Sequence, residues 1–303
     1  SIAEANSAEG STTAASAASA ASAASGAVTG VGAASMYDHE FIAFADPAVV
    51  KSIAPLEALG WKVLTRPAPV DVAEIKGDYL RGRIEKTGCC GAAELIKLHA
   101  WTLTDYHRVV HLDMDSLVLQ NMDELFELDE SLVYTCDYNM QNSNSRAKGK
   151  PCPVQGGFVV VRPSMGAFNA MVDIVKEGHW GGEYGSGWEG TGIGHWWGGP
   201  TFQGLVPFFY QHAADKALYP SVEVDRCVYN NMVDDPITNP LPMSGTSDCR
   251  AVAYESIKNV HFTLCQKPWT CNVPQQPGDD QHFCAALHAK WHRLRENMEG
   301  ERG

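Results

Sequence analysis

Hydrophobic residues from about residue 40 onward fall into two kinds of block. Short, continuously apolar blocks of strand length alternate with longer blocks in which apolar residues recur at helical spacing. The predicted strands cover residues 41–44, 61–64, 108–112, 132–135 and 157–161. The predicted helices cover residues 47–59, which Gly60 ends, 95–104 and 168–176. Strands that alternate with helices predict an α/β fold with a mostly parallel central sheet and a ligand at the carboxyl ends of its strands.

The first part of the chain has a different composition. Residues 1–35 are mostly Ala, Ser, Gly and Thr, and no aromatic residue precedes Tyr37. Such a segment has little to bury, so it is predicted to be a disordered linker. It is either a stem that holds a catalytic domain away from a membrane anchor or a solvated tail. One globular domain is expected over 36–290 and a C-terminal tail over 291–303. No run of eighteen apolar residues occurs, so this chain is expected to hold no membrane span.

The charge and the cysteines narrow the classes of function. A formal charge of -13 and a pI near 5.2 argue against a nucleic-acid binder, since that affinity depends on Lys and Arg at phosphates. An anionic ligand must then be held by a metal or by a few basic residues. The sequence has nine cysteines, most of them in its last third. That number indicates the secretory-pathway lumen, for instance the Golgi, with the cytoplasm as the alternative.

Two acidic residues follow the predicted strand 108–112 directly. Asp113 and Asp115 are separated by one residue, a spacing that puts both side chains on one face of an extended chain, so both can reach one ion where the strand ends. A hard divalent cation with oxygen ligands neutralises a diphosphate leaving group, which is what transfer from a nucleotide-sugar requires. A solvated acidic turn fits the same short pattern, so only the surrounding sequence can distinguish a metal site from such a turn.

That surrounding sequence resembles a known family. Residues 97–126 are closely similar to the corresponding region of glycogenin and its relatives, glycosyltransferase family 8. Further similar blocks follow in the family's order at 157–164, 203–205, 260–262 and 267–269. The resemblance implies a Rossmann-like GT-A domain. It also implies a retaining transfer of a sugar, expected to be a hexose, from a UDP-sugar to a hydroxyl of a carbohydrate or protein acceptor.

The resemblance also implies a set of site residues. By similarity, Asp113 and Asp115 bind a divalent metal, usually Mn²⁺, and His261 completes its protein ligands. An imidazole among carboxylates suits manganese better than calcium. Lys267 would contact the diphosphate as a fixed cation, where charge develops as the bond breaks. Lys97 matches the family's basic residue near the sugar and the phosphates, although a lysine on a helix surface is the simpler interpretation of that residue alone.

The chain departs from the family at the position of a catalytic carboxylate. Relatives of the glycogenin type carry Asp-Gln-Gly where this chain has Phe202-Gln203-Gly204. Double displacement needs a carboxylate nucleophile, so a same-face attack, with the leaving phosphate accepting the acceptor's proton, is the better hypothesis. Gln203 would then hydrogen-bond the sugar. Asp137, after the strand 132–135, is a spare carboxylate that could do the same.

Other departures concern the donor. Gln155 and Gly156, before Gly157, stand where relatives have Asn followed by Ser or Ala, and these residues are expected to line the donor site. The family's first strand, which cradles the base, has no counterpart in the Ala/Ser-rich segment, so the sheet is expected to lack it. A disulfide that closes the loop from Cys265 to Cys271 would rigidify the segment around Lys267, but the nearby cysteines leave the pairing open.

A loop dense in Gly and Trp covers residues 178–199 and is a candidate lid or acceptor groove. Its tryptophans either stack on sugar rings or simply pack the loop; they are Trp180, Trp188, Trp196 and Trp197. Two other functions stay open. One is a catalytically silent relative that binds carbohydrate or a protein through this loop, and the other is an acidic lumenal metal buffer built on His and Cys. A homodimer is also open.

Overall fold

The computed structural model describes residues 35–137, 140, 151–232, 249, 251–263, 267–270 and 283–300, together with the backbone of 2–7. Two compact units share these residues, where the sequence predicts a single domain over 36–290. The first unit comprises Ser1–Ala8, Tyr37–Leu112 and Glu124–Val224. The second comprises Glu9–Met36, Asp113–Asp123 and Asp225–Gly303.

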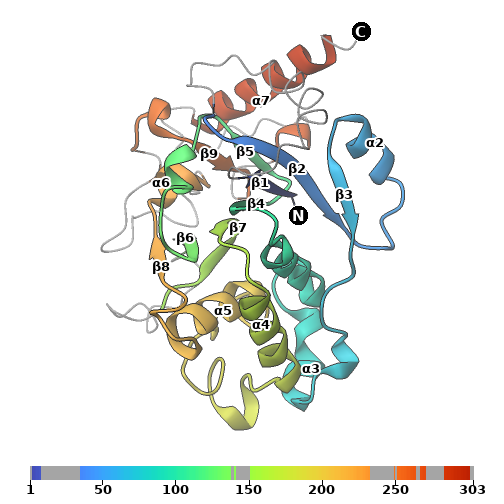
Figure 1. Ribbon diagram of the computed structural model, residues 1–303, viewed down its shortest axis with the longest axis vertical. Helices are drawn as coiled ribbons and strands as arrows, with labels where there is room; N and C mark the ends of the chain where they lie inside the picture. The colour runs from blue at the N-terminus through green and yellow to red at the C-terminus, as the bar shows by residue number, and fades with distance from the viewer. Residues whose placement is uncertain are drawn as a thin grey trace. The chain divides into compact units, whose positions relative to one another are not determined.

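The first unit contains a sheet in the order β3-β2-β1-β4-β7-β6-β8 (Figure 1). Its strands are β1 Ile2–Ser7, β2 Asp38–Ala45, β3 Lys62–Thr65, β4 Arg108–Leu112, β6 Leu132–Cys136, β7 Val154–Val161 and β8 Ser221–Glu223. Only the pairs β2–β3 and β6–β8 are parallel, and the other pairs in this sheet are antiparallel. The prediction of a mostly parallel sheet is therefore wrong. A parallel pair needs a crossover, but the helix α4 follows β7 instead of separating it from β6.

The strand β1 falls within the predicted linker. Ile2–Ser7 pair with β2 on one side and β4 on the other, antiparallel to both. The sheet thus has a strand in the place where the family's first strand was expected to be missing, and the structure differs from a disordered linker at these six residues. Unpaired backbone groups on the flanking strands offer hydrogen bonds to any extended segment, whatever its composition. Residues 8–34 of the predicted linker lie outside the described residues.

The predicted strands and helices are found, with one clear difference in length. The helix predicted over 47–59 is reduced to α2, Ile53–Ala58. Its first residues instead form a turn, in which Oδ1 of Asp46 accepts a hydrogen bond from the Ala48 amide at 2.8 Å. An aspartate that bonds the backbone two residues on favours a turn over a helix.

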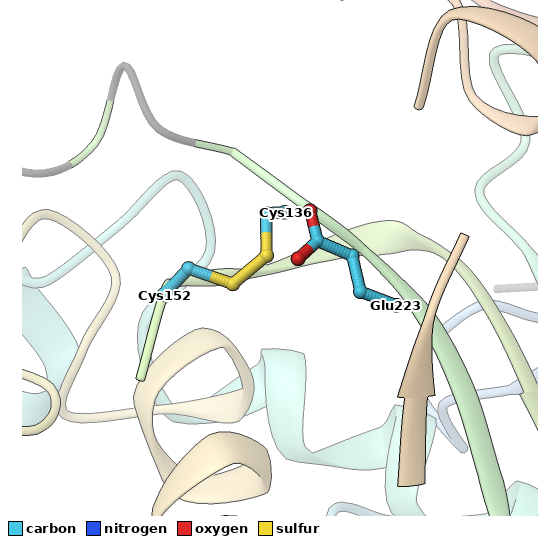
Figure 2. Close-up of side chains that lie close together, drawn as sticks. All are labelled: Cys136, Cys152 and Glu223. Atoms are coloured by element: carbon cyan, nitrogen blue, oxygen red, sulfur yellow. A yellow bond between two sulfur atoms is a disulfide. The ribbon is translucent and has the colours of Figure 1, made fainter. Parts of the chain in front are cut away.

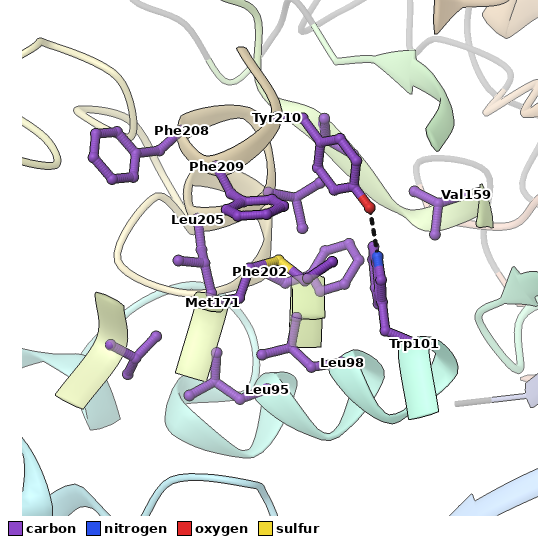
Figure 3. Packing of buried hydrophobic residues seen from close by; sticks show 14 of the residues in the cluster. Leu95, Leu98, Trp101, Val159, Met171, Phe202, Leu205, Phe208, Phe209 and Tyr210 are labelled. Atoms are coloured by element: carbon purple, nitrogen blue, oxygen red, sulfur yellow. Dashed lines mark hydrogen bonds between the residues drawn. The ribbon is translucent and has the colours of Figure 1, made fainter. Parts of the chain in front are cut away.

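The core of the first unit lies between the sheet and helices that the sequence only partly predicts. These are the 3₁₀ helix η3, Gly91–Thr102, and the α-helices α4, Met165–Glu177, and α5, Phe202–Phe208. Figure 3 shows Leu95 and Leu98 of η3 facing Phe202 of α5, with the Trp101 indole donating to the Tyr210 hydroxyl at 2.6 Å. The left-handed Gly178, φ 73°, ends α4. Shorter helices in this unit are η1 Val72–Glu74, α3 Asp78–Arg83, η2 Ile84–Lys86, η4 Asp123–Leu125, η6 Gly182–Tyr184 and the π-helical turn η7 Phe209–Ala213.

The second unit is built around a two-stranded antiparallel sheet of β5, Ser116–Val118, and β9, Asn259–His261. Buried side chains of β9 and of the helix α7, Phe283–Gly300, form its small core; they include Val260, Cys284 and Leu287. The helix continues past residue 291, where a tail was predicted, because good helix formers without Pro or Gly run up to Gly300. The remaining helices are α6 Arg226–Tyr229, η8 Tyr254–Ser256 and η9 Pro268–Thr270.

Disulfides occur in both units. Cys136 pairs with Cys152 in the first unit, and Cys227 pairs with Cys249 in the second. Persistent disulfides are typical of oxidising compartments and agree with the predicted secretory pathway. Cys265 and Cys271, whose pairing the sequence leaves open, lie outside the described residues. Among the helices that the structure describes, none is long and apolar enough to cross a membrane.

Candidate functional site

The two acids predicted to hold a metal lie in the second unit, at the turn that leads into β5. The Ser116 amide donates to the Asp113 carbonyl at 3.0 Å, which closes the turn. Met114, between the acids, is 62% exposed and points away. Asp113 and Asp115 are two positions apart, a spacing that favours one face of the chain, and both carboxylates lie near the same imidazole, that of His261.

Strand pairing brings the imidazole to these acids. In the β5–β9 ladder Ser116 is opposite His261, and the Phe262 amide donates to the Asp115 carbonyl at 2.8 Å. His261 Nε2 lies 3.2 Å from Oδ1 of Asp115 and 3.9 Å from Oδ2 of Asp113. One ligand atom from each of the three residues lies within 4.8 Å of the others. Two carboxylate oxygens and one imidazole nitrogen form a donor set that fits a manganese-like cation.

Asn231, which the sequence analysis missed, holds β9 from its other side. Its backbone carbonyl accepts from the His261 amide at 2.9 Å, and its own amide donates to the Asn259 carbonyl at 3.0 Å. Its side-chain nitrogen donates to the carbonyls of Cys227 at 3.0 Å and Cys249 at 3.2 Å. The disulfide between those cysteines is thus connected to His261 through one buried asparagine. Nothing in the residue types alone indicates this role, because it depends on strand pairing.

Lys267 places a positive charge at the edge of the same group. Its Nζ forms an ion pair with Oδ2 of Asp115 and donates to the Phe262 carbonyl. Burial would raise the pKa of Asp115, but the hydrogen bonds and charges of His261 and Lys267 outweigh burial and hold that pKa below its ordinary value. Asp115 is therefore an ionised, acceptor-only group at neutral pH, as a metal ligand must be.

The other predicted site residues lie in the first unit, and Lys97 is central among them. Its Nζ donates to the Gly156 carbonyl at 3.1 Å and lies 5.8 Å from the centre of the Phe202 ring. The residue is buried, so it is not a lysine on a helix surface. A buried ammonium needs a compensating charge, and Oε1 of Glu94 supplies one at 3.6 Å.

Glu94 was not among the predicted site residues. It precedes Lys97 by one helical turn, and the Thr201 hydroxyl donates to its Oε2. The side chain of Glu94 is only 2% exposed. The signal that could have found it is an acid and a base at i and i+3 within an otherwise apolar helix, a spacing at which side chains meet.

The departure at Phe202 has a structural explanation. Phe202 is fully buried and packs against Trp101, with ring centres 6.0 Å apart, so this position belongs to the hydrophobic core (Figure 3). Gln203 follows it and is 5% exposed, and its Oε1 has no hydrogen-bond partner among the described residues. That oxygen lies so close to Gly198 that a Cβ there would be 2.1 Å from it.

The remaining predicted donor residues are also in the first unit. The Gly157 amide donates to Oε1 of Gln155 at 2.5 Å, so this side-chain oxygen accepts a hydrogen bond from within its own strand, β7. Asp137 is buried directly after β6, and its amide donates to the Pro153 carbonyl at 2.9 Å. The predicted residues thus fall into two groups: Asp113, Asp115, His261 and Lys267 in the second unit, and Lys97, Asp137, Gln155, Gly157 and Gln203 in the first.

Some tryptophans of the glycine-rich loop are buried and one is exposed. Trp180 and Trp188 are buried and bridge to each other, and their indole nitrogens donate to the carbonyls of Gly194 at 3.2 Å and Gly199 at 2.9 Å. They pack the loop. Trp197 is 54% exposed and stays a candidate for contact with a ligand.

A second group with metal-ligand residue types contains Cys136, Cys152 and Glu223 (Figure 2). Its two sulfurs are joined in a disulfide, so neither is available as a thiolate. The same holds for Cys227 and Cys249. These pairings argue against a metal buffer built on these cysteines.

The sequence is similar to known proteins over part of its length, although no family model matches it. Glycogenin-2 of Homo sapiens is 27% identical over 217 residues, which are 67% of this chain and 35% of that protein. Glycogenin-1 of Oryctolagus cuniculus is 35% identical over 83 residues, 27% of this chain and 22% of that protein. The chain is a homologue of the glycogenin-type glycosyltransferases. The resemblance to family 8 is therefore confirmed.

This glycogenin homologue is also similar to inositol phosphorylceramide glucuronosyltransferase 1 of Arabidopsis thaliana, at 29% identity over 126 residues, 40% of this chain and 18% of that protein. It covers well under two thirds of each of these relatives. Among solved structures, mouse xyloside xylosyltransferase 1 in its apo form aligns with a TM-score of 0.42 and 13% identity over 77% of this chain and 84% of that chain. Likeness of that degree carries no conclusion, so the GT-A assignment stays a prediction.

Proposed function

We propose that this glycogenin homologue is a metal-dependent, retaining glycosyltransferase of the GT-A type that moves a sugar from a UDP-sugar to a hydroxyl acceptor. The observation that supports this most is the meeting of Asp113, Asp115 and His261 around one point. A divalent cation such as Mn²⁺, held by these residues, would neutralise the diphosphate as it leaves.

The residues around this point have distinct roles in the proposal. His261 is held in place by β5 and Asn231, so it offers a fixed nitrogen to the cation. Lys267 holds its ammonium beside Asp115, where negative charge increases on the diphosphate as the bond to the sugar breaks.

In the first unit, Lys97 and Gln203 would contact the donor sugar and its phosphates, with Asp137, Gln155 and Gly157 shaping the donor site. Phe202 supports a same-face transfer, since a core phenylalanine stands where relatives of the glycogenin type carry a carboxylate. We place the reaction in the secretory pathway, in the Golgi, because of the disulfides.

UDP release tests the proposal. We expect release from a panel of UDP-sugars that includes UDP-glucose, in the presence of Mn²⁺ and not after chelation, and its loss in Asp115→Asn. Asp105→Asn is the matched control, because Asp105 is an exposed acid of the other unit. Equal activity in Asp115→Asn and in the control would contradict the proposal.

A catalytically silent relative is the second candidate, and the exposed Trp197 favours it. An exposed indole can stack on a sugar ring or a partner protein without any turnover. Oligosaccharide binding that Trp197→Ala abolishes, in a chain that releases no UDP from any donor in the panel, would favour this function over the transferase.

A further inference from the structure

Glu94 and Lys97 form an internal pair whose charges cancel. The side chains are 2% and 10% exposed, and Oε1 of Glu94 lies 3.6 Å from Nζ of Lys97. A carboxylate leaves water at a large cost unless charged or hydrogen-bonding partners surround it. Here the partners are Lys97 and the hydroxyl of Thr201. Glu94 therefore places a buried negative charge directly beside Lys97.

The pair lies against the strand that was expected to line the donor site. A Cβ added to Gly156 of β7 would be 3.2 Å from Nζ of Lys97 and 3.5 Å from Oε1 of Glu94. Gly156 thus allows both charged groups to approach the β7 backbone closely. An alanine there would press on both groups at once.

A buried acceptor without a donor lies close by in the chain. Thr201, the partner of Glu94, is two residues from Gln203, whose Oε1 has no hydrogen-bond partner in the described part of the protein. A buried oxygen in this state costs free energy that a donor would recover. A sugar hydroxyl is such a donor. The carboxylate of a uronic acid is not, because it only accepts hydrogen bonds, although the ring hydroxyls of a uronic acid can still donate.

We propose that Glu94 determines the class of donor sugar, by favouring an uncharged sugar, a hexose or pentose, over a uronic acid. The inference rests on the proposed function, in which Lys97 and Gln203 contact that sugar. Without Glu94, the positive charge of Lys97 would be less compensated and would favour a uronate. With Glu94 in place, a second carboxylate meets a like charge in a region of low dielectric, where repulsion is far stronger than in water.

Donor competition tests this inference directly. The wild-type chain is expected to use UDP-glucose, UDP-galactose or UDP-xylose with a kcat/KM at least about tenfold above that for UDP-glucuronate, since that ratio corresponds to a small part of the repulsion between close buried charges. Glu94→Gln removes the charge and keeps the size, so the ratio should fall by about tenfold. A wild type that prefers UDP-glucuronate, or an unchanged ratio in Glu94→Gln, overturns the inference.

Two further variants separate charge from structure. Glu94→Asp keeps the charge, and Thr201→Val removes the hydroxyl contact while leaving the charge in place, so both should retain the preference for uncharged donors. A preference lost equally in Thr201→Val would show that packing, and not charge, sets it, and would overturn the inference. Should Glu94→Gln fail to fold, the ratio in Glu94→Asp and Thr201→Val still decides.

The result also separates this inference from the proposed function. If the wild type releases UDP only from UDP-glucuronate, the transferase stands and the inference fails. If it turns over no donor with Mn²⁺, the proposed function fails, and binding of UDP-glucose against UDP-glucuronate is measured by calorimetry in the same variants. Binding that prefers the uncharged donor and loses this preference in Glu94→Gln supports the inference. Absence of binding to both overturns it.

Discussion

The acid and imidazole group of the second unit and the Glu94–Lys97 pair of the first unit handle charge in opposite ways. In the second unit Asp113 and Asp115 keep side chains 25% and 19% exposed, and their negative charge is only partly met by Lys267. In the first unit the carboxylate and the ammonium are both buried and compensate each other. A group that retains excess negative charge and access to solvent suits a cation, whereas a neutral buried pair suits an uncharged ligand.

The largest effect is expected from replacing His261. His261→Gln keeps a polar side chain but not the imidazole nitrogen, and it is expected to lower Mn²⁺-dependent UDP release by on the order of 10²-fold, the usual scale for a lost electrostatic contact to a transition state. Mn²⁺ binding, followed by the loss of the free-ion EPR signal, should weaken in parallel.

The matched control is His288→Gln. His288 is equally buried in the second unit, but it lies beside Phe262, with ring centres 5.6 Å apart. If both variants weakened Mn²⁺ binding to the same degree, the loss would come from the fold of the unit and not from a ligand.

Sequence reasoning found the acids and missed much of what positions them, for a physical reason. Asp113 and Asp115 follow a continuously apolar strand, so their place at a strand end is a local property. The strands β5 and β9 are three residues each, too short for a period, and they join residues far apart in the chain. His261 was found by resemblance alone, and Asn231 by neither route. Likewise, β2, β3, β4, β6 and β7 of the main sheet follow from local pattern, but β1 and β8 do not. The direction of pairing depends on connections that the pattern does not encode.

Removing one member of the buried pair should be far more costly than removing one member of an exposed pair. Lys97→Met leaves the buried carboxylate of Glu94 without its ammonium partner, with the Thr201 hydroxyl still donating to it, and is expected to reduce the free energy of unfolding by about 3 kcal/mol. Lys97→Met combined with Glu94→Gln should recover much of that loss. Urea unfolding followed by circular dichroism gives both values.

Lys76→Met is the matched control in the same unit. Its ion pair with Glu177, at 2.6 Å, has side chains 69% and 49% exposed, so the change should stay below about 1 kcal/mol. A Lys97→Met variant as stable as this control would show that Glu94 gains water or another partner, and the contrast between the two units would disappear.

A smaller effect is expected from Asn231→Ala. The side chain connects the carbonyls of Cys227 and Cys249 to β9, so its loss should loosen His261 without removing a ligand. Mn²⁺ affinity is expected to fall by about tenfold, the lower end for residues that orient ligands. Gln120→Ala is the control, since Gln120 donates to the Ile257 carbonyl at 3.0 Å and does not contact β9. An unchanged affinity in Asn231→Ala would assign the orientation of His261 to β5 alone.

The smallest expected effect is on thiol chemistry. Disulfides occur in both units, and among the described residues the first unit also has free thiols at Cys89 and Cys90. Partial desolvation, a hydrogen bond between the Cys89 and Cys90 sulfurs and the charge of Glu94 raise the pKa of the Cys89 thiol to about 12. Since only the thiolate reacts, native Cys89 should be alkylated slowly by iodoacetamide at pH 8, and its rate should still rise between pH 8 and pH 10.

Glu94→Gln removes one of the causes of the raised pKa, so it should increase the alkylation rate modestly. Peptide mass spectrometry measures this, with the unfolded chain as the reference for an ordinary thiol. Native labelling as fast as in the unfolded chain would mean that neither desolvation nor the charge of Glu94 raises the pKa of this thiol.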